Sequence, residues 1–351
     1  MKHLLFFLLF VSVLVFPALV KAEGELQLQA EVTRIDSRIQ VDGIDQAVFE
    51  VVGENGANYT IDTSQGFVQG LRYDINVGDS VILQLIENPD GTTTAFLKDV
   101  VRTNALIWIF VFFGVMTAIV GRWRGVFALV GLGITLAIVF GWLYPTILAG
   151  GDAVSSTVSA SIVILAVNMA LSHGIGRSTQ VAFGGTVVGL VLALIFAKVF
   201  VALANLSGLA SEEASLLALN VGPIIIPQGI LLAGIILGAV GVLDDITITQ
   251  GETVAELSSA NPSLNRKELY RRAMNVGRHH IASTVNTLVL AYAGAATPLF
   301  LLFLATRGTT VGGFINEEVV SEEIIRTLAG TCALVLTVPI STWFATLFQK
   351  R

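Results

Sequence analysis

Hydrophobic residues in the last two thirds of the chain form long, almost uncharged runs. A helix that crosses a bilayer needs about 20 consecutive apolar residues, and these runs have about that length. A segment after Asn205 that re-enters the membrane would change the number of crossings. The pattern predicts seven membrane-spanning helices, at residues 105–120, 126–147, 154–171, 181–205, 221–243, 281–304 and 324–347.

A different pattern precedes these runs, between residues 26 and 102. Apolar and polar residues alternate there in short stretches, such as residues 26–30, 48–51 and 80–85, as they do in half-buried strands. Turn residues such as Val41-Asp42-Gly43 separate the stretches. The segment is therefore predicted to form a small, OB-like β-barrel or sandwich of five to six strands.

The first 22 residues resemble a secretory signal peptide. A short basic start with Lys2 and His3 precedes the apolar residues 4–20, and Val20-Lys21-Ala22 forms a small-x-small cleavage site. An uncleaved signal anchor is the alternative, and in both cases the β-module is exported.

Composition supports a membrane protein. Hydrophobic residues make up 54% of the chain and charged residues 13%, against about 25% charged residues in soluble domains. The formal net charge of -6 argues against nucleic acid as a partner. The single cysteine, Cys332, excludes an intramolecular disulfide and a CxxC site.

The distribution of charge predicts the orientation of the chain. With the β-module outside and seven crossings, the basic residues fall mainly in cytoplasmic connections, as the positive-inside rule requires. This predicts a multi-pass protein of the bacterial plasma membrane with a cytoplasmic C-terminus. The predicted cytoplasmic side holds Arg122, Arg124, Arg177, Arg266, Lys267, Arg271, Arg272, Arg278, Lys350 and Arg351, and the outer side Asp152, Glu212, Glu213, Glu317, Glu318, Glu322, Glu323, Arg307 and Arg326.

The most polar connection of the membrane part is a predicted cytoplasmic loop at residues 244–280. Asp244 and Asp245 begin it, at the foot of a span. If the following residues are helical, Asp245, Thr249, Glu252 and Glu256 share one face, which could bind a divalent cation or relay protons. Alternatively, Asp244 or Asp245 caps the next helix, and the Ile-Thr-Ile-Thr run at residues 246–249 and Gly251 weaken the prediction of a helix.

The entrance of the sixth predicted span is also polar. Ser263 or Asn265 is expected to start the helix that continues into this span. Arg278 lies on one side of that helix. His279, Ser283 and Asn286 form one stripe, and His280, Thr284 and Thr287 form its neighbour. Adjacent histidines point about 100° apart on a helix, so a two-histidine metal site is not predicted. Proton chemistry with Asp244 or Asp245 and simple interhelical hydrogen bonding remain open.

Proline, lysine and glycine residues also stand out within the predicted spans. Pro223 and Pro227 interrupt the fifth span, either to line a substrate path or as tolerated kinks. Lys198 is expected to extend toward the outer interface, and Gly234 and Gly238 to serve helix packing. The sequence contains no P-loop, HExxH motif or nucleophile elbow, and no enzymatic activity is predicted.

Several runs resemble the YibE/F-like family of bacterial membrane proteins over about the last 230 residues. In that family an Asp stands where this chain has His279, which favours His280 as the functional histidine. The resemblance implies a polytopic membrane protein behind an exported domain. The matching runs are residues 241–247, 268–278, 280–288, 290–294, 323–330 and 338–340.

These observations predict a permease or an ion- or proton-coupled transporter of unknown substrate. The alternatives are a receptor or assembly protein that links the β-module to the cytoplasmic loop, and an intramembrane enzyme. The expected partners are the lipid bilayer, a small solute or ion, and another copy or a second membrane protein; no cofactor or metal is predicted. The candidate functional residues are Asp244, Asp245, Thr249, Glu252, Arg278, His280, Ser283 and Asn286.

Overall fold

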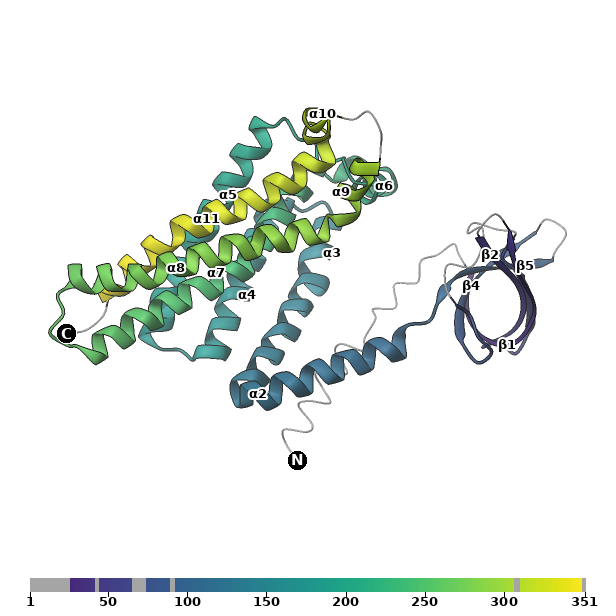
Figure 1. Ribbon diagram of the computed structural model, residues 1–351, viewed down its shortest axis with the longest axis horizontal. Coiled ribbons are helices and arrows are strands. Elements are labelled where there is room, and N and C mark those ends of the chain that lie inside the picture. The colour runs from purple at the N-terminus through teal and green to yellow at the C-terminus, as the bar shows by residue number, and fades with distance from the viewer. Residues whose placement is uncertain (1–25, 42–43, 65–73, 89–91, 306–309, 349–351) are drawn as a thin grey trace. The chain divides into compact units, whose positions relative to one another are not determined.

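The computed structural model describes residues 26–41, 44–64, 74–88, 92–305 and 310–348 (Figure 1). The predicted signal peptide, residues 1–22, lies outside the described residues. The chain divides into two compact units at Arg122. Each unit is described by itself.

The first unit contains a curved antiparallel sheet. Its strands are β1 (Leu26–Val41), β2 (Ile44–Gly53), β3 (Asn58–Asp62), β4 (Ser80–Glu87) and β5 (Thr93–Val100), in the order β3-β2-β1-β4-β5. Alternate residues such as Phe49, Val51 and Leu83 are fully buried, as the period of two requires. Register shifts in β1 mark irregularities that bend a strand. The result is a half-barrel, which confirms that this segment forms a small antiparallel β-module.

The first two predicted spans form one helical stretch. Helix α2 (Thr103–Ile138) contains a break at Arg122, which has a φ of 51°, a rare conformation for a residue other than glycine. The stretch continues through a π-helix, η1 (Val139–Leu143), into α3 (Tyr144–Leu148). Helices α4 (Ala153–His173) and α5 (Arg177–Leu203) follow.

The structure has a break in the helix at the start of the fifth predicted span, residues 221–243. Helix α6 (Glu212–Val221) leads into a single 3-10 turn, η2 (Gly222–Ile224), and α7 then runs from Pro227 to Ala260. Proline suits the first turn of a helix, because the N–H that it lacks has no partner there. The predicted limits of 221–243 are therefore wrong at both ends, and the segment called a cytoplasmic loop is helical except around residues 261–265.

The last part of the chain contains α8 (Arg266–Ala295), α9 (Thr297–Ala305), α10 (Val311–Ile315) and α11 (Glu318–Phe348). Asn265 caps α8, as predicted, because its Oδ1 accepts a hydrogen bond of 2.9 Å from the Glu268 N–H. Helices α8 and α9 meet at a bend of 61°. In the part of the chain described, five helices are long and apolar enough to cross a membrane, or up to six if this bent pair counts as one span.

Helices α5, α7 and α11 form the centre of the bundle, with α4 and α8 packed beside them (Figure 1). Glycines on α5 allow the close approach. A Cβ atom added to Gly185 would lie 3.0 Å from the Cβ of Ser341, and one added to Gly189 would lie 2.6 Å from the Oγ1 of Thr337. These α5 glycines therefore serve close helix packing.

Candidate functional site

The predicted carboxylate stripe lies on α7. Because the helix continues past Asp244 and Asp245, neither residue caps the next helix. Asp245 and Glu252 are exposed, and the Thr249 hydroxyl donates to the Asp245 carbonyl oxygen of its own helix, at 2.8 Å. Across the helix pair, Glu252 Oε1 lies 4.0 Å from His173 Nε2 of α4. The stripe is therefore mostly an exposed surface of α7.

Asp244 differs from the rest of the stripe because it is half-buried. Its Oδ1 atom is inaccessible and has no hydrogen-bond partner among the described residues. Ile246 of the same helix packs in a cluster with Met274 of α8. Residues two apart on a helix point about 200° apart, so Asp244 points away from α8. It does not converge with His280.

The predicted residues of α8 lie mainly on its outer surface. Arg278, Ser283 and Asn286 are exposed, whereas His280 is half-buried. The guanidinium of Arg278 donates to Asn275 Oδ1 of its own helix at 3.2 Å. These residues and the α7 stripe are therefore mostly exposed side chains of their own helices. The described residues also hold no group of three or more His, Cys, Asp or Glu side chains that could bind a metal ion.

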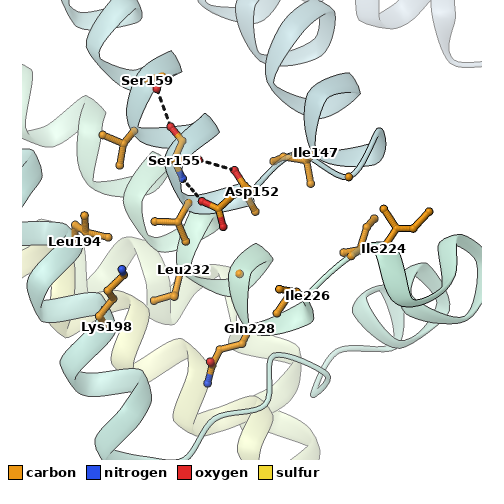
Figure 2. A pocket seen from close by; sticks show the side chains of 17 residues that line it. Ile147, Asp152, Ser155, Ser159, Leu194, Lys198, Ile224, Ile226, Gln228 and Leu232 are labelled. Atoms are coloured by element: carbon orange, nitrogen blue, oxygen red, sulfur yellow. Dashed lines mark hydrogen bonds between the residues drawn. The ribbon is translucent and has the colours of Figure 1, made fainter.

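The structure instead shows a pocket at the end of the bundle where α4 begins, here called the Asp152 pocket. It has a volume of about 730 Å³ and lies between the start of α4, the last turns of α5 and the break before α7 (Figure 2). None of the eight predicted site residues lines it. Its charged lining residues are Asp152 and Lys198.

Asp152 is held in place by the helix that it caps. Its Oδ1 accepts a hydrogen bond of 2.7 Å from the Ser155 N–H at the start of α4. This bond is the main cause of the lowered pKa of Asp152, and the positive charge of Lys198 acts in the same direction. Asp152 is therefore an anion with a fixed position on one wall of the pocket.

Lys198 comes from a different wall (Figure 2). It lies on α5 and forms no ion pair with a described residue. From the sequence, Lys198 is expected to reach the membrane interface and Asp152 to lie in an outer loop. Only the packing of α4 against α5 and α7 reveals that the two charges share a pocket. Two features of the sequence point to these residues: Lys198 is a lone lysine in an apolar span, and Asp152 directly precedes a helix.

Gln228 connects the pocket to the segment between α5 and α6. Its Nε2 donates to the Leu206 carbonyl oxygen at 2.7 Å. Gly208, which has a φ of 78°, lies so close to the Pro227 carbonyl group that a Cβ atom would be 2.6 Å from its oxygen. Residues 204–210, here called the α5–α6 connection, therefore pack directly against the beginning of α7.

A second set of charges lies on α11 near the same connection. Glu318 accepts hydrogen bonds from the backbone N–H groups of Ser207 and Gly208. Glu322 is buried, and the Nε atom of Arg326 lies 3.5 Å from Glu323 Oε1. From the sequence, these residues are expected on the outer side or at a helix mouth, and no functional role is predicted for them.

Comparison with known proteins gives one match. The model of a protein family described as YibE/F-like protein matches residues 108–351. No curated protein and no solved structure matches the chain.

Proposed function

The chain belongs to the YibE/F-like family, and from that premise we propose that it is a permease for a small polar solute. The observation that carries the proposal is the Asp152 pocket, which adjoins the start of α7 at Pro227. The first turn of a helix has backbone N–H groups without a partner in the helix, and such groups can bind a polar solute.

The two charges of the pocket define the class of solute. Lys198 suits an anionic group, and Asp152, whose one oxygen is bonded to Ser155, suits a cationic group. The rest of the lining includes apolar side chains such as Ile226 and Leu232. A small zwitterion, such as an amino acid, complements this arrangement.

The proposed topology has seven crossings with the Asp152 pocket facing outward. The break at Arg122 divides the helical stretch from Thr103 to Leu148 into two segments, each long enough to cross, and the bent pair α8–α9 supplies another crossing. The half-barrel is then outside the plasma membrane and the C-terminus in the cytoplasm, which agrees with the positive-inside rule. We further propose an OB-like fold for the half-barrel, because β1 pairs with both β2 and β4.

Cysteine labelling tests this topology. In a Cys332→Ser background, a cysteine at Glu212 should react with a membrane-impermeant maleimide in intact cells. A cysteine at Ser263 should react only after the cells are permeabilised. The opposite result at either site would refute the proposed orientation.

Solute binding tests the pocket. We expect detergent-purified protein to bind at least one radiolabelled amino acid, and Lys198→Gln to weaken that binding about tenfold or more, because a charged hydrogen bond contributes about 1.5–3 kcal/mol. Lys267→Gln, which removes an exposed charge at the start of α8, is the matched control and should bind as the native protein does. Equal affinity in all three proteins would exclude the pocket as the site.

A further inference from the structure

Glu322 is a buried carboxylate without a complete set of partners. The residue is 7% exposed, and its Oε1 atom has no hydrogen-bond partner among the described residues. The backbone N–H of Ala210, in the α5–α6 connection, stabilises the ionised form of the carboxylate. A buried charge without full compensation is costly, and in membrane proteins such groups are rare and usually functional.

The charged groups that face Glu322 all come from its own helix. Glu318 and Glu323 oppose its negative charge, and Arg326 compensates it. From the α5–α6 connection the facing group is the uncharged Ala210 N–H. Two acids and one base therefore surround the third acid.

The base itself is incompletely paired. The Arg326 Nε atom is buried, and its contact with Glu323, at 3.5 Å, does not form a hydrogen bond. From α8, Tyr292 interacts electrostatically with Arg326 and Glu323. Gly234 of α7 faces the guanidinium, because a Cβ atom there would lie in ordinary van der Waals contact with Arg326 Nη1, at 3.5 Å. The cluster thus joins α7, α8 and α11 beside the α5–α6 connection.

We propose that Glu322 is a proton-binding site that controls the attachment of the α5–α6 connection to α11. The described residues include no group of three or more His, Cys, Asp or Glu side chains that could hold a metal ion. A proton requires only the unpaired oxygen atom, on which it forms an O–H bond and removes one negative charge from the cluster. This role rests on the proposed permease function, in which the proton bound by Glu322 would be the coupling ion.

Protonation changes a specific contact. An ionised carboxylate attracts an N–H group more strongly than a neutral acid does, so protonation weakens the attraction between Glu322 and the Ala210 N–H. The α5–α6 connection is then held by Glu318 and by Gln228, which also lines the Asp152 pocket. Proton binding is in this way linked to the wall of the solute site.

The test measures the accessibility of the connection without any solute. Leu209, which is 42% exposed, is replaced by cysteine in the full-length Cys332→Ser protein, and its rate of reaction with a water-soluble maleimide is followed against pH. Because thiol reactivity itself changes with pH, each rate is divided by the rate in the Glu322→Gln variant, which mimics the protonated state. We expect a ratio near one at acidic pH and about tenfold lower at alkaline pH.

Two further variants control the measurement. Glu212→Gln removes an exposed carboxylate of α6 and should retain the pH-dependent ratio. Glu322→Asp keeps an ionisable group and should retain it as well, which separates loss of the carboxylate from a general disturbance of folding. A ratio that does not change with pH would overturn the proposal. If the pH response persists while no amino acid binds, the proton site stands and the permease function fails.

Discussion

Replacing Gly189 with alanine is expected to destabilise the helix bundle by about 1–3 kcal/mol, the usual cost of overpacking a core. The new Cβ atom would lie 2.6 Å from Thr337 Oγ1 and 2.9 Å from Leu243 Cδ2. Neither neighbour can move easily: Leu243 is fully buried, and the Thr337 hydroxyl donates to the Ala333 carbonyl oxygen at 2.7 Å. The expected result is a lower midpoint of thermal unfolding in detergent.

Gly184→Ala is the matched control for this prediction. Gly184 lies on the same helix, and a Cβ atom there would have no neighbour within 4 Å. Both variants gain the same helix propensity. The difference between their unfolding midpoints therefore measures the effect of the steric clash at Gly189 alone. If the two variants are equally stable, the close packing of α5 against α7 and α11 is contradicted.

Replacing Arg326 with methionine is expected to destabilise the protein by roughly 3 kcal/mol, because it leaves a buried acid, Glu322, without a compensating charge. Arg326 lies 3.5 Å from Glu323 and is the charge that compensates Glu322. Methionine has a similar length and retains much of the apolar contact of the arginine side chain. The measurement is thermal or denaturant-induced unfolding in detergent.

A second substitution shows whether charge causes the effect. Adding Glu322→Gln to Arg326→Met removes the uncompensated carboxylate and should restore a large part of the lost stability. The two changes therefore should not be additive. Additive losses would show that the arginine acts through packing rather than through charge compensation.

The sequence predicts the helices of this protein better than their ends. The Ile-Thr-Ile-Thr run and Gly251 argued against a helix after Asp245, yet α7 continues through them. Ile246, Thr247 and Gln250 of this part are completely buried. Their packing outweighs the modest propensity of β-branched residues and glycine against helix. This contribution is tertiary and cannot be derived from one segment alone.

The spacing of glycines was also ambiguous. Gly234 and Gly238 of α7 match a pattern for close helix packing, but here they face polar side chains of other helices. A Cβ atom at Gly238 would lie 3.0 Å from the Tyr292 hydroxyl, and Gly234 faces Arg326. The same four-residue spacing serves both purposes, so only the neighbouring helices distinguish them.

The candidate site was the least predictable feature. Sequence reasoning concentrated on the polar residues of α7 and α8, because they are the most conspicuous in an apolar chain. The Asp152 pocket depends on α4, α5 and the break before α7, which are separated in sequence. Each of its charges had an ordinary explanation alone, Asp152 as a loop acid and Lys198 as an interfacial lysine. The role proposed for the two charges rests on their common pocket.

Uptake of radiolabelled amino acids into proteoliposomes tests the central claim most directly. The proposed function predicts that the native protein and Lys267→Gln transport at least one of these solutes, and that Lys198→Gln transports it far more slowly. Absence of uptake of every amino acid by the native protein, or equal uptake by Lys198→Gln, would contradict a zwitterion permease that binds its solute in the Asp152 pocket.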